Sequence, residues 1–220
     1  MSNKLIALYA LFAFPLFSGA QSENPAFPFN ELGVSANYTF DVSDDYPVKN
    51  GIGGGLAVYR SWRTDKKVNL VTGIDYNFTS FKTDSVFDNP GYYFRDGRFR
   101  HHQFRIPFSV RFQMGTTTTF FIEPGAYINF LLAGSMRGTG ITAPTGETAP
   151  QTVTQHLQPG FDPGLLLGIG IQIPCTGGYL IFKADVNKGL GRTPTAQGTP
   201  NESFFFYNSF TRLSVIFSRR

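Results

Sequence analysis

The sequence predicts an all-β protein, an eight-stranded antiparallel up-and-down transmembrane β-barrel. Three observations predict this fold. Apolar and polar residues alternate in eight segments after residue 30, which is typical of strands with one apolar face. The links between these segments alternate between short and long, as in a meander whose two ends face different compartments. An export signal precedes the first segment.

The N-terminal residues have the pattern of a secretory signal peptide. Lys4 precedes an apolar run over 5–17, and the small residues Ser18, Gly19 and Ala20 form a cleavage site. The run is too short to cross about 30 Å of hydrocarbon as a helix. The predicted organisation is therefore a signal peptide over 1–20, an extended leader over 21–30, and an outer-membrane β-barrel domain over 31–220.

The first four predicted strands each place apolar side chains on one face. The opposite face carries glycine, asparagine, serine and charged residues. The strands cover 32–40, with Leu32, Val34 and Tyr38 on the apolar face; 52–62, with Ile52, Leu56 and Val58; 68–81, with Leu70, Ile74 and Phe78; and 98–112, with Phe104, Ile106 and Phe108.

The last four predicted strands repeat the pattern. They cover 119–133, with Phe120, Ile122 and Phe130 on the apolar face; 164–173, with Leu165, Leu167 and Ile169; 179–188, with Leu180, Phe182 and Val186; and 205–217, with Leu213, Val215 and Phe217. Pro107 and Pro124 fall inside neighbouring strands. Since proline cannot donate to a β-ladder, we expect each to weaken its strand or to mark a bulge.

The links fall into two classes. Short links are predicted at 63–67, 113–117 and 174–178, and long links at 41–50, 82–97, 134–162 and 189–203. Bacterial outer-membrane barrels have even strand numbers, short periplasmic turns and long extracellular loops. The short links lie on the same side as both termini, which predicts that this side is periplasmic.

The polar face indicates which way the strands point. Alternation alone also fits a lipocalin-like soluble barrel with its apolar face inward. Here the polar face is rich in glycine and carries charges of both signs, which suits a narrow, crowded lumen. Since buried charges have to be paired, we predict a lumenal ion-pair network of Asp75, Arg105, Arg111, Glu123, Lys183, Asp185 and Arg212.

Aromatic residues gather near the predicted strand ends, as in the two girdles of a membrane barrel. The outer girdle is predicted at Tyr38, Phe40, Phe78, Phe81, Phe99, Phe130 and 204–207, and the inner girdle at Tyr59, Trp62, Phe112, Phe120, Tyr179 and Phe217.

Three segments resemble a known family. Residues 104–112 (FRIPFSVRF), 121–127 (FIEPGAY) and 164–172, with Gly168 and Gly170, are similar to strands of the PorT-like outer-membrane β-barrel family. The resemblance implies an eight-stranded barrel in the outer membrane of a Bacteroidota-type, Gram-negative bacterium, with a link to protein secretion. It also implies that Phe217 is a C-terminal assembly signal read by the barrel-assembly machinery, although Ser218, Arg219 and Arg220 follow it.

The sequence offers little for chemistry. Cys175 is the single cysteine, and the three histidines include the adjacent pair His101 and His102, which should point to opposite faces of a strand. We therefore expect no metal site, no cofactor and no catalytic residues. The basic residues are scattered, which argues against nucleic acid as a partner.

Three functions remain open. The first is a structural or interaction barrel in outer-membrane lipid, with a side-chain-filled lumen and a secretion-machinery or surface partner bound through its loops. The second is a soluble exported ligand-binding barrel. The third is a lipid-modifying enzyme, for which a nucleophile and a base would have to meet at the outer rim.

Overall fold

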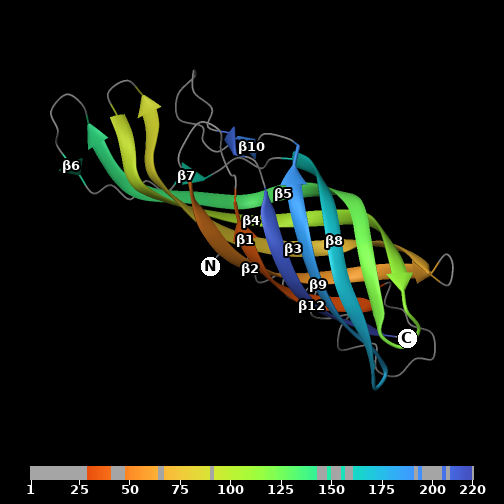
Figure 1. The fold of residues 1–220 in the computed structure, drawn as a ribbon. Helices are drawn as coiled ribbons and strands as arrows, with labels where there is room; N and C mark the ends of the chain where they lie inside the picture. Colours follow the sequence, from red (N-terminus) through yellow and green to blue (C-terminus); the bar gives the residue numbers. More distant parts are fainter. Residues whose placement is uncertain are drawn as a thin grey trace, which may run out of the picture.

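The chain forms a closed β-barrel in a computed structural model that describes residues 29–40, 48–63, 67–89, 92–142, 148–149, 155–156, 161–190, 193–194, 205–206 and 209–219. The predicted signal peptide and most of the leader, residues 1–28, lie outside these ranges. Among the described residues, eight long strands form the wall (Figure 1): β1 Glu31–Thr39, β2 Val48–Arg63, β3 Val68–Asn89, β4 Tyr92–Met114, β5 Thr119–Thr142, β8 Phe161–Cys175, β9 Gly178–Gly189 and β12 Phe210–Arg219.

Each long strand pairs antiparallel with the next one along the chain, and the last returns to the first. β1 lies between β2 and β12, with Glu31 opposite Ser218 and Thr39 opposite Phe210. β4 pairs with β5, so the sheet has no open edge over the body of the barrel. The predicted fold class is confirmed. No helix among the described residues is long and apolar enough to cross a membrane.

The two ends of the barrel differ, and we name them the turn end and the loop end. The turn end holds the tight turns at 115–118 and 176–177, where Gly115 and Gly177 have φ angles of 114° and 83° that favour glycine. It also holds both ends of the described chain, since the Arg219 amide donates to the Asn30 carbonyl at 2.8 Å. The third predicted short link is described only at its margins.

At the loop end the prediction of a long link over 82–97 is wrong. β3 and β4 continue as a hairpin as far as Asn89 and Tyr92, and β5 runs on to Thr142 (Figure 1). The short strands β6 (Thr148–Ala149) and β7 (Gln155–His156) pair with β5. The apolar residues of 82–97 are clustered and do not alternate with polar ones, so the sequence pattern does not mark this part of the hairpin as strand.

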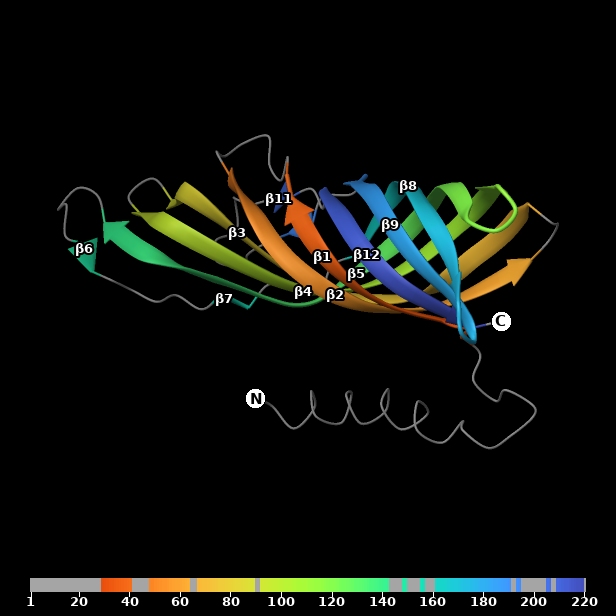
Figure 2. The ribbon, with the colours of Figure 1, turned by 60° about the horizontal axis from the view of Figure 1, so that its bottom comes forward.

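The start of the last strand also differs from the prediction. Phe205–Phe206 forms a separate strand, β11, which pairs with β10 (Thr193–Pro194), and β12 begins only at Phe210. In the barrel wall, where Figure 2 labels it, β12 covers 210–219 and so begins five residues later than the predicted start at 205.

The direction of the two faces agrees with the prediction. Apolar side chains such as Val34, Leu167 and Leu213 point outward and are 56%, 55% and 62% exposed, whereas Asp75 and Arg105 are fully buried. Successive side chains alternate between the two faces along the long strands, except where the register shifts. The exterior is thus apolar, while the interior combines buried charges with a cluster of buried apolar side chains that includes Val71, Phe121, Ile181 and Ile216.

The two prolines interrupt the pairing of strands locally but do not shift its register. Pairing is interrupted beside Pro107 in the β3–β4 ladder and beside Pro124 in the β4–β5 ladder, but the register resumes unchanged on the far side. The missing amide thus removes a local ladder bond without inserting a residue. A register shift lies instead between His102 and Gln103, where Leu132 and Ala133 of β5 are both exposed.

Candidate functional site

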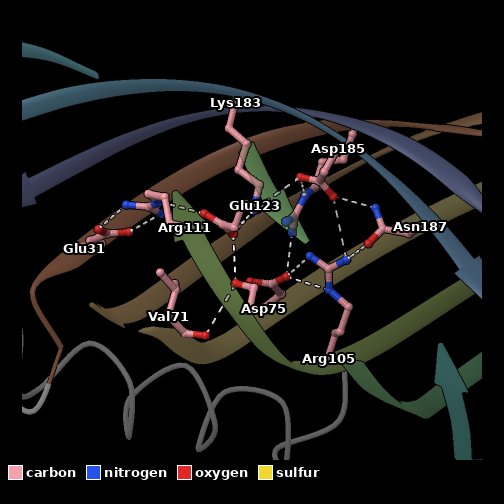
Figure 3. Close-up of polar contacts among 11 residues, drawn as sticks. Glu31, Val71, Asp75, Arg105, Arg111, Glu123, Lys183, Asp185 and Asn187 are labelled. Carbon is pink, nitrogen blue, oxygen red and sulfur yellow. Dashed lines mark hydrogen bonds and ion pairs between the residues drawn. The ribbon is translucent and has the colours of Figure 1, made fainter. Parts of the chain in front are cut away.

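The barrel interior contains a cluster of eight charged side chains, which we name the interior ion network. It comprises the seven predicted residues, Asp75, Arg105, Arg111, Glu123, Lys183, Asp185 and Arg212, together with Glu31, which the sequence reasoning missed. None of the eight is more than 5% exposed. They come from β1, β3, β4, β5, β9 and β12, so the network joins strands from all sides of the cylinder (Figure 3).

One half of the network is built on Asp75. Oδ2 of Asp75 accepts from Arg105 Nε at 2.7 Å and from Arg212 Nη1 at 2.5 Å. Asp75 lies directly opposite Arg105 in the β3–β4 register, so the neighbouring strands place this pair together. Arg212 reaches the same carboxylate from β12. One acid therefore ties three strands by charge-assisted hydrogen bonds.

Asp185 completes this half. Its Oδ2 accepts from Arg212 Nε at 3.0 Å, and its Oδ1 accepts from Asn187 Nδ2 at 2.5 Å. The Asn187 side-chain oxygen accepts in turn from Arg105. Arg212 thus lies between two carboxylates, that of Asp75 on β3 and that of Asp185 on β9.

The other half of the network is built on Glu123. Its two oxygens accept from Arg111 Nε at 2.6 Å, from Ser109 Oγ at 3.0 Å and from the Lys183 ammonium. Arg111 also donates to both oxygens of Glu31, at 2.8 and 3.2 Å. Each guanidinium nitrogen of Arg111 therefore has a carboxylate partner.

The two halves meet at Lys183, whose Nζ lies 3.9 Å from Asp185 Oδ2. Four cations face four anions, so the interior ion network carries no net charge. A buried charge without its partner is strongly destabilising, while a paired one is tolerated. This balance of charge explains how eight charged side chains can be buried together in one interior.

Aromatic rings pack against the buried arginines, and glycines leave room for the large side chains of the interior. The Arg111 guanidinium lies 4.9 Å from the ring centre of Phe121, and that of Arg105 lies 5.4 Å from the ring centre of Tyr127. β8 contributes Gly164 and Gly168 to the interior, together with the buried Asp162. A Cβ at Gly164 would lie 2.2 Å from Tyr127 Cζ, and one at Gly168 would lie 2.7 Å from Lys183 Cε.

Three predicted girdle residues lie inside the barrel. Tyr59, Phe81 and Phe99 are 2–3% exposed, and the rings of Phe81 and Phe99 stack at 5.0 Å. Each of the three occupies a position of its strand whose side chain points into the barrel, so it is buried although aromatic residues often lie at the membrane–water interface. Tyr38, Trp62, Phe112, Phe120, Phe130 and Phe217 are exposed on the exterior.

The two adjacent histidines point to opposite faces. His101 is buried in the interior, while His102 lies on the exterior, where its Nδ1 is 2.6 Å from the Tyr76 hydroxyl. The described part of the chain contains no group of three or more His, Cys, Asp or Glu residues that could hold a metal ion. Cys175 is exposed beside the turn at 176–177.

Phe217, the predicted assembly signal, is 42% exposed on the exterior of β12 near the turn end. It lies opposite Leu32 of β1 and Leu180 of β9, so it sits in the seam where the first and last strands close the barrel.

Comparisons with known proteins find solved structures of similar fold but do not assign the chain to a family. No protein-family model matches the chain, and no curated protein matches it. Among solved structures, Ail, the attachment invasion locus protein of Yersinia pestis, is 13% identical at a TM-score of 0.36 and covers 87% of this chain and 99% of its own. A major outer membrane protein of Thermus thermophilus is 15% identical at a TM-score of 0.47, covering 85% and 98%. Neisserial surface protein A is 10% identical at a TM-score of 0.41, covering 86% and 96%. At these values the likeness carries no information on function.

Proposed function

We propose that this chain is an integral outer-membrane protein whose exterior faces lipid. The observation that carries the proposal is a belt of exposed apolar side chains around the whole closed cylinder. Every long strand contributes to it, with exposed fractions of 44–62% at Leu32, Leu56, Leu70, Phe108, Ile122, Leu167, Val186 and Leu213. Water-soluble monomers rarely expose an apolar surface of this extent.

The closed backbone supports the same proposal. A bilayer offers no water to unpaired amides and carbonyls, so only helices and closed barrels span it. Here each long strand has a partner on both sides. A soluble ligand-binding barrel would bury its apolar strand face, whereas here that face is exposed and the interior holds the interior ion network.

The orientation follows from the two ends. Short turns and both termini are periplasmic in single-chain outer-membrane barrels, and longer extensions are extracellular. The turn end of this barrel is then periplasmic, and the hairpin extensions of β3, β4 and β5 project outside the cell. The secretory signal peptide predicted over 1–20 supplies the export step, and a mature chain beginning at Gln21 is the expected product.

The filled lumen argues for a structural or interaction role. An eight-stranded barrel is just wide enough for its own side chains, and those of Arg105, Arg111 and Arg212 are at most 1% exposed. Specific binding then belongs to the loop end. The similarity of three strands to the PorT-like family supports a role accessory to protein secretion.

Membrane fractionation tests the proposal. The full chain, expressed with its signal peptide in a Gram-negative host, should stay in the membrane pellet after alkaline washing and should migrate differently before and after boiling. A soluble exported barrel would instead be released without detergent. Recovery of a folded monomer in detergent-free buffer would overturn the proposal.

The filled lumen is tested separately by electrical recording. The purified protein in a planar bilayer should show no stepwise conductance, because the interior ion network occupies the cross-section of the barrel. Regular conductance steps that scale with protein concentration would contradict the assignment of a closed lumen while leaving the membrane location intact.

The assembly role of Phe217 is tested by comparing two exterior aromatics. Phe217→Ala should lower the folded fraction in the outer membrane, because the barrel-assembly machinery is proposed to read this residue. Phe182→Ala, at a site with a similar exposed fraction of 41% on β9, is the matched control. Equal loss in both variants would indicate a general effect of lipid contact.

A further inference from the structure

Four basic side chains gather on the exterior of the barrel toward the loop end, and we name them the basic row. Lys82 of β3 lies directly opposite Arg98 of β4, which lies directly opposite Arg137 of β5. Arg100 occupies the next outward-facing position on β4, toward the middle of the barrel. All four side chains are exposed.

This arrangement is unfavourable in the isolated protein. Like charges directly opposite one another on neighbouring strands destabilise a sheet. The structure gives none of the four an ion pair among the described residues, and the cross-strand partners of Arg100 are the uncharged Ser80 and Ser135. The exposed acid on this part of β4, Asp96, lies within the register shift between Arg95 and Arg98, and the structure gives it no ion pair with the row.

The basic row begins where the apolar belt ends. One outward step below Arg100 lie His102 and its register partner Phe78, with rings 5.1 Å apart. One step further are Tyr76 and Phe104, with rings in edge contact at 5.9 Å. The order along the exterior is therefore apolar, aromatic, then basic, which is the order expected on passing from hydrocarbon through the interface.

The spacing places the basic row at the depth of lipid headgroups. Two residues along a strand span about 7 Å, and the headgroup layer adds about 5–8 Å to each side of the hydrocarbon. Arg100 is two residues beyond His102, and Arg98 is two residues beyond Arg100. Long basic side chains from these positions reach the level of the lipid phosphates.

The row lies on three adjacent strands, and Lys49 of β2 is directly opposite Lys82. Exterior positions near the loop end of β1, β8 and β12 carry the uncharged residues Phe40, Phe161 and Thr211, while β9 carries the exposed Lys188 there. A ring of scattered positive charge would indicate general attraction to an anionic surface, whereas a row on three adjacent strands presents several donors to one group. Guanidinium groups bind phosphate oxygens in a bidentate manner.

Resting on the proposed outer-membrane location, we propose that Lys82, Arg98, Arg100 and Arg137 bind the phosphate groups of an anionic lipid of the outer leaflet. The occupant is lipid-borne because the row borders the apolar belt on the barrel wall, where acyl chains would lie against Phe78 and Phe104. A soluble polyanion would gain nothing from that contact.

The test measures the binding of lipid A to the protein in micelles of a maltoside. Maltoside detergents contain no phosphate. Fluorescent bisphosphorylated lipid A is titrated against the full-length folded protein, with dephosphorylated lipid A as the comparison. The triple variant Arg98→Gln/Arg100→Gln/Arg137→Gln should lose affinity for the phosphorylated lipid by about fivefold per cation, on the order of a hundredfold in all. Its affinity for the dephosphorylated lipid should not change.

Matched controls use basic residues at the other end. Lys67→Gln/Arg219→Gln removes two exposed cations at the turn end and should leave the phosphate preference intact. If the triple variant does not fold, the single variant Arg100→Gln and the wild type at low and high salt give the same information. A wild type that does not distinguish the two lipids, or a triple variant that still does, overturns the proposal.

Two further measurements distinguish failure of the lipid-phosphate site from failure of the membrane location. Competition by soluble inorganic polyphosphate as strong as that by lipid A would show a general polyanion surface and overturn the lipid assignment. Failure of the wild type to insert into vesicles of neutral phosphatidylcholine would refute the membrane location itself. Insertion into those vesicles without any phosphate preference would refute the lipid-phosphate site alone.

Discussion

The guanidinium of Arg111 on β4 donates to both carboxylate oxygens of Glu31 on β1, at 2.8 and 3.2 Å. These strands are not neighbours in the sheet, since β2 and β3 lie between them. The bidentate pair therefore crosses the interior and joins the first strand of the barrel to its far wall. Such a contact forms only when the cylinder is closed, so it favours the closed state over an open sheet.

This crossing contact predicts a large energetic coupling. Glu31→Gln and Arg111→Met should each lower the free energy of unfolding by about 3–5 kcal/mol, because each leaves a buried charge short of a partner. The double variant should lose less than the sum, with an interaction of up to about 3 kcal/mol. Urea unfolding of the barrel in micelles measures all three. Strictly additive losses would mean that the two side chains do not interact in the folded protein.

Glu123 is the second test of the interior ion network, because one carboxylate accepts from three donors. Glu123→Gln should cost about 3–5 kcal/mol, since Lys183 would then have only Asp185, at 3.9 Å. Adding Lys183→Met should recover part of this loss by removing the excess cation. A double variant less stable than Glu123→Gln would show that Lys183 has another stabilising partner.

The residues of the network could be predicted from the sequence because strand periodicity is strict. Once one face is assigned to the lumen, every second residue follows, and the seven predicted charges share that parity. Glu31 was missed because the predicted strand began at Leu32. Continuing the inward series Asn37, Ser35 and Gly33 by one step would have included it, since β1 begins at Glu31.

Other parts of the structure differ from what the sequence predicts. Tyr59, Phe81 and Phe99 were assigned to the girdles on residue type, although the parity of their strands points inward. The β3–β4 ladder continues to Asn89 and Tyr92 through residues 82–97, whose apolar residues do not alternate regularly with polar ones. The sequence therefore predicts the strands of the barrel wall more accurately than the extensions beyond them.

The glycines of β8 are predicted to be required for interior packing. In Gly164→Ala the new Cβ would lie 2.2 Å from the Tyr127 ring, so overpacking should cost about 1–3 kcal/mol. Gly54→Ala is the matched control, because the nearest atom to its Cβ, the Ser35 carbonyl oxygen, is 3.2 Å away. In urea unfolding, the free energy of unfolding of Gly54→Ala should be close to that of the wild type. A tolerated Gly164→Ala would imply that Tyr127 moves freely within the lumen.

The exterior face is tested by placing a charge in the belt. Leu167 is 55% exposed at the middle of β8, and Leu167→Arg should cost about 2–4 kcal/mol in a bilayer, as for an arginine facing lipid at mid-depth. Thr118→Arg adds the same side chain at an exposed position of a turn, where the cost should be about 0–1 kcal/mol. Both are measured by reversible unfolding from lipid vesicles.

The neighbouring residue gives the opposite test of the same assignment. Gly168 faces the interior, and a Cβ there would meet the terminal methylene of the flexible Lys183 side chain, so Gly168→Ala should cost less than Leu167→Arg in lipid. The reverse ranking would mean that the glycine face meets the bilayer. Because adjacent residues on a strand face opposite sides, that result would invert every face of the barrel and remove the interior ion network with it.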